Sequence, residues 1–108
     1  METVQFNEKV PLQDVGNGVS RKLLAYSERL MPVEVHFEKG ATGAVHQHEH
    51  QQATYVLEGV FEFTKNGIPI IVKKGDSLLF EENEPHGARC LEKGAVLDIF
   101  TPYRKDFV

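Results

Sequence analysis

Residues 40–59 have the sequence GATGAVHQHEHQQATYVLEG, and this stretch decides the fold. Within it, His46 and His48 flank a single residue, and Gln52 follows after three more. Alternate side chains of an extended strand share a face, so we expect His46 and His48 to point the same way. His50 has the same parity and is a further candidate for that face. Two imidazoles side by side on a stiff strand are half of a metal site.

The third imidazole of such a site would come from His86, which follows a polar loop much later in the chain. A lone histidine on a strand is more often a surface or core residue than a ligand. We assign His36 to that class because it alternates with glutamates. For His46, His48 and His86 together, the pattern favours a common metal ion.

Size and composition place limits on the kind of protein. The chain has 108 residues, 41% hydrophobic and 26% charged, which predicts one soluble domain over residues 1–108. The formal charge of −4 and the lack of a basic cluster argue against nucleic acid as a partner. No apolar run predicts a membrane span, and Met1–Gln5 lacks the features of a secretion signal, so we expect a cytoplasmic protein. The single cysteine, Cys90, cannot form an internal disulfide, and we interpret it as a packing residue.

Glycines punctuate the sequence at short intervals, with brief segments rich in Val, Ile, Leu, Phe and Thr between them. This rhythm predicts an all-β sandwich or barrel of antiparallel strands. Residues 33–37 alternate apolar and polar side chains and give the clearest half-buried strand. Further strands are expected around the paired histidines and at 18–26, 54–63 with a bend at Gly59, 68–72, 77–80, 86–90 and 95–100. No long helix is predicted, and residues 102–108 are expected to be irregular.

Asn66-Gly67 is the strongest hairpin signal in the chain, because both residues tolerate positive φ. The dipeptide separates the apolar residues 61–64 from residues 68–72. Pro69, in the second segment, cannot donate to a strand ladder and should lie at an edge or a bulge.

The histidine pattern resembles the two motifs of the cupin family. The first is Gly, five residues, His-x-His, three or four residues, an acidic residue, six residues and Gly. This sequence supplies Gly40, His46, His48, Gln52 and Gly59 at those positions. The second is Gly, five residues, Pro-x-Gly, two residues, His, three residues and Asn. Here Gly75 and His86 fit, whereas Glu81, Asn83 and Cys90 replace the Pro, Gly and Asn. The resemblance implies one small jelly-roll β-barrel with a metal held in its mouth by His46, His48, Gln52 and His86.

Gln52 stands where cupins usually have a glutamate. A neutral amide oxygen would leave the full charge on a divalent ion, which makes it a stronger Lewis acid. Imidazole ligands suit Zn, Ni, Cu or Fe, and an amide oxygen also admits Mn, so the metal stays open. Gln51 competes for the oxygen role, but strand parity favours Gln52.

Three further stretches resemble the KdgF-type cupins, which are associated with pectin and alginate breakdown. They are residues 18–24, 32–40 and 97–104, and with the metal motif they extend the likeness over nearly the whole chain. The implied activity is linearisation of 4,5-unsaturated monouronates to the open-chain 5-keto-4-deoxyuronate. The family's functional Asp, Phe and Arg would fall on Asp98, Phe100 and Arg104.

The implied roles follow the chemistry of the substrate. Asp98 would take the proton of the C1 hydroxyl and return a proton at C4. Arg104 would bind the substrate carboxylate by two hydrogen bonds, and Phe100 would pack against the sugar. Each has a structural alternative: a satisfied carboxylate for Asp98, a core residue for Phe100 and a surface charge for Arg104.

Two other functions remain open from the sequence. One is an iron-dependent dioxygenase that consumes O2, and the other is a non-catalytic module that binds a sugar or effector.

An exposed strand edge on a small barrel favours a homodimer.

Overall fold

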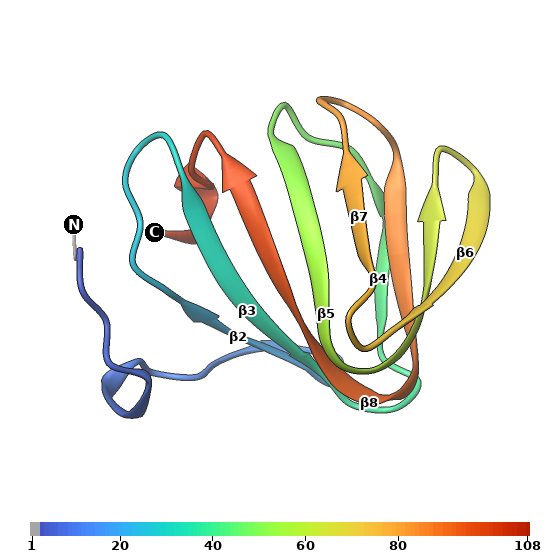
Figure 1. Ribbon diagram of the computed structural model, residues 1–108, viewed down its shortest axis with the longest axis horizontal. Helices are drawn as coiled ribbons and strands as arrows, with labels where there is room; N and C mark the ends of the chain where they lie inside the picture. The colour runs from blue at the N-terminus through green and yellow to red at the C-terminus, as the bar shows by residue number, and fades with distance from the viewer. Residues whose placement is uncertain (1–2) are drawn as a thin grey trace.

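The computed structural model describes residues 3–108 as one continuous antiparallel sheet folded into two layers (Figure 1). Its eight strands are β1 (Gln13–Gly16), β2 (Val19–Leu23), β3 (Met31–Phe37), β4 (Thr42–His46), β5 (Gln51–Lys65), β6 (Ile68–Lys73), β7 (Ser77–Phe80) and β8 (His86–Thr101). Two single 3-10 turns, η1 (Asn7–Lys9) and η2 (Lys105–Phe107), are the helical elements of the described part. Neither is long or apolar enough to cross a membrane. The predicted all-β antiparallel class is confirmed.

The long strands β5 and β8 pair with each other and belong to both layers. Their outer partners change along their length: the first half of β5 pairs with β7 and its second half with β6. Likewise, the first half of β8 pairs with β4 and its second half with β3. One layer therefore has the order β1-β2-β3-β8-β5-β7 and the other β4-β8-β5-β6. Both long strands curve at the lower edge of Figure 1, where they pass between the layers.

Two glycines allow this crossing. Gly59 has a φ of +87°, and the ladder between β5 and β8 is irregular around it. A Cβ added at Gly94, on the facing strand, would lie 2.0 Å from the carbonyl oxygen of Glu58. The two backbones thus approach more closely than any side chain would allow.

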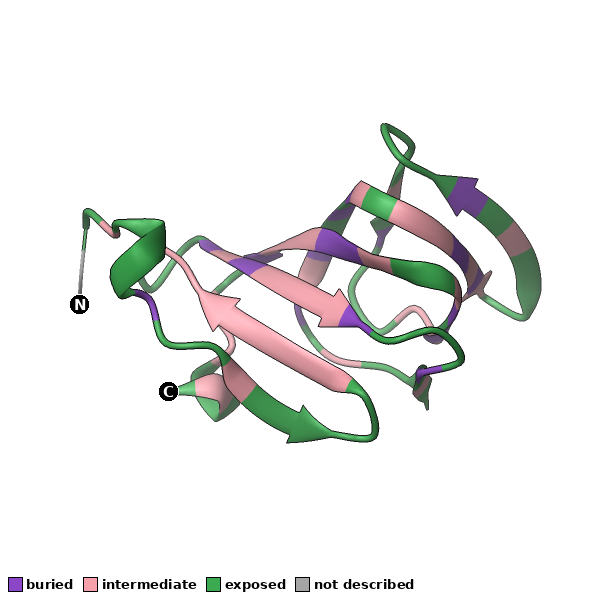
Figure 2. Cartoon of the chain, turned by 90° about the horizontal axis from the view of Figure 1, so that it is seen from below, coloured by how far each residue is buried: buried purple, intermediate pink, exposed green. Residues whose placement is uncertain are grey.

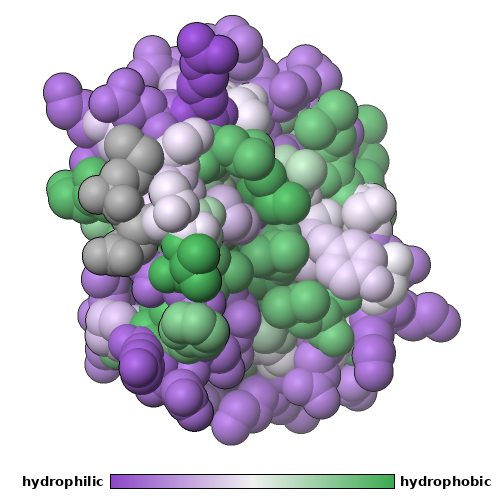
Figure 3. All heavy atoms as spheres, turned by 60° about the vertical axis from the view of Figure 1, so that its left-hand side comes forward, coloured by the Kyte–Doolittle hydropathy of each residue, from purple (hydrophilic) through white to green (hydrophobic). Residues whose placement is uncertain are grey.

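Apolar side chains form two clusters between the layers. The larger includes Phe61, Phe80 and Val96, and the smaller consists of Met31, Val33 and Phe100 with neighbours around them. Figure 2 shows the buried residues along the central strands, and the exposed ones mainly in hairpins and turns. Some apolar side chains remain exposed, and Figure 3 shows one face on which they are interspersed with polar ones.

Most strand predictions are confirmed. Asn66 and Gly67 both have positive φ and close the β5–β6 hairpin, and Pro69 lies on β6, which pairs only with β5. However, residues 86–90 and 95–100 were expected as separate strands, and they form the single strand β8. The glutamate, lysine and glycine at 92–94 looked like a turn, but their backbone follows the bend of β5 instead.

Candidate metal centre

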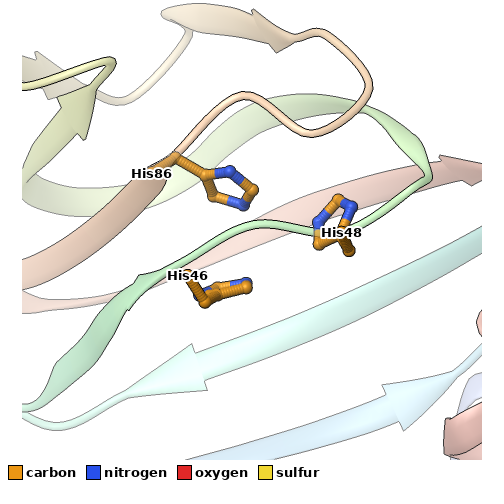
Figure 4. Close-up of side chains that lie close together, drawn as sticks. All are labelled: His46, His48 and His86. Carbon is orange, nitrogen blue, oxygen red and sulfur yellow. The ribbon is translucent and has the colours of Figure 1, made fainter.

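Three imidazoles converge at one end of the sandwich (Figure 4). His46 ends β4, His86 begins β8, and the two residues pair across the β4–β8 ladder. His48 lies beyond the end of β4, in the turn that leads to β5, so the expectation that one strand carries both His46 and His48 is wrong. The carbonyl oxygen of His48 accepts a hydrogen bond from the backbone N–H of Asn83 at 2.7 Å, which fixes this turn. One ring nitrogen from each histidine lies within 4.8 Å of the other two.

Each imidazole is oriented by its other nitrogen. Nδ1 of His46 lies 2.8 Å from the carbonyl oxygen of Ala44, and Nδ1 of His86 lies 2.9 Å from that of Glu84. Nδ1 of His48 lies 3.0 Å from the carbonyl oxygen of His50. A carbonyl only accepts, so Nδ1 of His46 and of His86 carries the proton, and Nε2 of each keeps its lone pair. This is the arrangement that metal-binding histidines require.

Two hydrogen bonds also fix the orientation of the Gln52 side chain. Its amide Nε2 donates to Thr54 Oγ1 at 2.9 Å and to Asp98 Oδ1 at 3.1 Å. These partners fix which end of the amide is oxygen, and Oε1 lies 3.1 Å from Nε2 of His48. His48 thus has an oxygen acceptor at each ring nitrogen, the carbonyl of His50 at Nδ1 and the amide oxygen of Gln52 at Nε2, but a neutral ring has one proton to donate. A cation between Nε2 and Oε1 would satisfy both of these atoms while Nδ1 keeps the proton. The donor set fits a transition metal held by three imidazole nitrogens and one amide oxygen.

Burial keeps two of these imidazoles, His48 and His86, neutral. Burial lowers the pKa of His48 to about 4, the contact with Gln52 opposes this shift, and the positive charge of Arg104 and the other two histidines add smaller decreases. Burial also lowers the pKa of His86, whose ring is 3% exposed and stacks on Phe80. Neutral imidazoles are ready to bind a metal without first releasing a proton.

Asp98 lies next to the candidate metal ligands. Its Oδ1 accepts hydrogen bonds from Gln52 and, at 2.7 Å, from the hydroxyl of Thr54. No described residue donates a hydrogen bond to Oδ2. Burial raises the pKa of Asp98 to about 6, although the hydrogen bonds from Thr54 and Gln52 and the charge of Arg104 oppose the rise. The structure thus places a carboxyl group with one free oxygen beside the histidines.

A cavity of about 210 Å³ lies between the two layers and reaches this group. His46, His86, Gln52 and Asp98 line it, and the remaining walls are largely apolar. Its size suits one small molecule rather than a polymer.

Phe100 and Arg104 both line the cavity, but each also makes contacts within the protein. Phe100 is 3% exposed and belongs to the smaller core cluster, so the structural role considered for it is present. Arg104 is no simple surface charge: its guanidinium lies 5.0 Å from the Phe100 ring. Its Nε and Nη2 donate to the two carboxylate oxygens of Asp106 at 3.1 and 2.9 Å. The two-point bond expected for a substrate is therefore made here to Asp106.

The other residues considered from the sequence have clear positions. His50 is buried and its Nε2 contacts the carbonyl oxygen of Tyr103, while its own carbonyl orients His48. Gln51 points away toward Glu81, and His36 pairs with Glu34. The packing role of Cys90 is confirmed, because its side chain is 1% exposed within the larger core cluster.

Two polar residues of this region escaped sequence reasoning. Thr54 lies two residues after Gln52 on the same strand, and this shared face was the sequence feature that could have indicated its place in the site. Arg21 also lines the cavity. The sequence feature that could have indicated this is its position on the apolar side of the alternation in residues 18–26.

Comparisons with known proteins agree with this geometry. Residues 33–100 match the cupin domain family. The chain is 43% identical over 104 residues to the pectin degradation protein KdgF of Dickeya dadantii, and the match covers 94% of each chain. Among solved structures, KdgF from Halomonas sp. superposes with a TM-score of 0.95 at 37% identity, covering 100% of both chains. An RmlC-like cupin from Shewanella frigidimarina superposes with a TM-score of 0.97 at 39% identity, covering 100% of this chain and 97% of that one. The chain therefore belongs to the cupin family and is a homologue of the pectin degradation protein KdgF.

Proposed function

We propose that this protein is a metal-dependent enzyme that linearises 4,5-unsaturated monouronates, the cyclic sugars that lyases release from pectin or alginate. The product would be the open-chain 5-keto-4-deoxyuronate. The observation that carries the proposal is the convergence of three imidazoles and the amide oxygen of Gln52, beside a carboxyl group and at a small cavity. The homology with KdgF supports the substrate class.

The reaction needs no co-reactant. The substrate has a hemiacetal at C1, and its ring oxygen is bonded to C5 of the C4–C5 double bond. Loss of the C1 hydroxyl proton forms the aldehyde, breaks the bond between C1 and the ring oxygen, and leaves an enolate at C5. Protonation at C4 then gives the ketone, so the reaction is an isomerisation and one proton moves from oxygen to carbon.

We assign the transfer of that proton to Asp98. Oδ1 is held by Thr54 and Gln52, which leaves Oδ2 to take the proton from the C1 hydroxyl and to return it at C4. One carboxyl group that ends each cycle in its starting state is sufficient for both transfers.

A divalent metal bound by His46, His48, His86 and Gln52 would supply Lewis-acid stabilisation of the negative charge that develops on oxygen. The amide of Gln52 brings no charge of its own to that site, and it also holds Asp98 by hydrogen bonding. Arg104 adds a positive charge at the cavity wall, which favours an anionic sugar. Phe100 forms an apolar part of the same wall.

The test is a direct assay. A 4,5-unsaturated galacturonate monomer is added to the purified, metal-loaded protein, and the loss of the conjugated double-bond absorbance is followed under anaerobic conditions. The proposal expects a rate well above the spontaneous one. A rate equal to the spontaneous one, with the 4,5-unsaturated monomers of both pectin and alginate, would rule it out.

A further inference from the structure

Arg21 is a charged residue of the cavity that the proposed mechanism does not use. It lies in the middle of β2, its side chain is half-buried, and it lines the same cavity as His46 and Asp98. Burial lowers its pKa, an effect that the nearby charge of Asp106 partly offsets. A guanidinium remains charged under these conditions, so the cavity contains a partly desolvated cation.

The hydrogen bonds of Arg21 leave its outer edge free. Nε donates to Oε1 of Gln13 at 3.2 Å. Within residues 3–108, neither Nη1 nor Nη2 donates to a side chain, and no carboxylate lies within 4.0 Å of them. Two parallel N–H groups, one on Nη1 and one on Nη2, are therefore available along the outer edge of the guanidinium plane.

The outer edge of Arg104 also has no partner among the described residues, but the carboxylate of Asp106 binds its Nε and Nη2 and offsets its charge. A substrate carboxylate at Arg104 would therefore compete with Asp106 for the charge of the guanidinium. Arg21 offers two donors without such competition.

Phe107 orients the Arg21 side chain. The guanidinium of Arg21 lies 3.9 Å from the centre of the Phe107 ring, and that of Arg104 lies 4.4 Å from it. A guanidinium that stacks on a ring uses its face for that contact and keeps its in-plane N–H groups for hydrogen bonds. The C-terminal turn η2 thus holds Arg21 in place without using its donors.

We propose that Arg21 is the residue that binds the substrate carboxylate, through paired hydrogen bonds from Nη1 and Nη2. This inference rests on the proposed function and adds to it the residue that selects a sugar acid over a neutral sugar. A planar fork matches a carboxylate in geometry and charge, and the anion offsets the desolvation of the cation.

The test compares Arg21→Met with Lys22→Met, which removes the same charge from the next residue of β2. Lys22 points to the other face of the strand and donates to Asn7. Calorimetry measures the binding of saturated galacturonate and of galactose, and kinetics measure KM and kcat for the unsaturated monomer. Arg21→Met should weaken galacturonate binding and raise KM by about tenfold or more, with a smaller change in kcat. Galactose binding, metal content and the Lys22→Met variant should be unchanged.

Arg21→Lys provides a second variant that keeps the charge but lacks the fork. Its KM should lie between those of the wild-type protein and Arg21→Met. If Arg21→Met fails to fold, the KM of Arg21→Lys tests the proposed carboxylate binding instead. Wild-type affinity for galacturonate in Arg21→Met, or an unchanged KM in Arg21→Lys, would overturn the inference even if linearisation is observed. If the wild-type protein binds galacturonate through Arg21 but does not turn over the unsaturated monomer, the inference stands and the proposed function fails.

Discussion

The side-chain amide of Gln52 donates a hydrogen bond to Oδ1 of Asp98 across 3.1 Å. The same amide directs its oxygen to within 3.1 Å of Nε2 of His48. One residue thereby joins the candidate metal ligands to the candidate acid–base group. A glutamate at this position would have no proton to donate and would repel Asp98, so the amide accounts for the departure from the usual cupin motif.

Replacing Gln52 by Glu should separate metal binding from catalysis. The new carboxylate keeps an oxygen near His48 but removes the donor to Asp98 and adds a like charge about 3 Å from it. We expect metal content to be retained and kcat for linearisation to fall by about tenfold or more. The control is Gln51→Glu, which alters the neighbouring, partly buried residue that faces Glu81 instead. Full activity in Gln52→Glu would show that the amide donor is not needed.

Replacing Asp98 by Asn tests the proton transfer. The change preserves shape, but an amide cannot accept and return a proton, so kcat should fall by about 100-fold or more. Metal content should stay at the wild-type level, because Asp98 lies beside the ligands rather than among them. Elemental analysis and the absorbance assay on the same sample would check both points. An active Asp98→Asn protein would assign the acid–base role to another group.

The close approach of β5 and β8 predicts that Gly94→Ala is strongly destabilising. A Cβ there would lie 2.0 Å from the carbonyl oxygen of Glu58, and the bend leaves the backbone no room to move. The free energy of unfolding should fall by about 3 kcal/mol. Gly43→Ala is the matched control, since an added Cβ meets no atom within 4 Å there. Equal denaturation midpoints for the two variants would contradict this account of the bend.

The thiol of Cys90 should be unreactive in the folded protein. It is 1% exposed, and its Sγ donates to the carbonyl oxygen of Glu92 at 3.0 Å. Burial raises its pKa, so the reactive thiolate is disfavoured at neutral and mildly alkaline pH. A disulfide reagent should label one thiol per chain rapidly in denaturant and slowly without it. Fast labelling of the native protein would mean that the core opens readily at this point.

Local sequence signals predicted much of the fold. Asn66-Gly67 forms the predicted hairpin because a tight turn needs positive φ at both positions, which is a local requirement. The alternation in residues 33–37 predicted β3 for a similar reason. By contrast, the continuity of β8 through residues 92–94 depends on pairing with β5, a partner distant in the sequence, and turn-forming residues concealed it.

The candidate site was predictable as a set of residues but only partly as a geometry. Strand parity indicated Gln52 rather than Gln51, and the structure directs only Gln52 toward His48. Parity was wrong for His48, because the strand ends at His46 and a turn places the second imidazole. Arg21 lies at the cavity beside Phe107 of η2, a contact between distant parts of the chain that no local pattern contains.

The central claim is that three imidazoles and the amide of Gln52 bind one ion, and X-ray absorption spectroscopy of the metal-loaded protein tests it most directly. We predict one tightly bound transition metal per chain, with three imidazole nitrogens and at least one oxygen in its coordination shell. His86→Ala should abolish tight binding, whereas His36→Ala, which removes the histidine paired with Glu34, should not. A protein that binds no transition metal, or that binds it equally well without His86, would contradict the account.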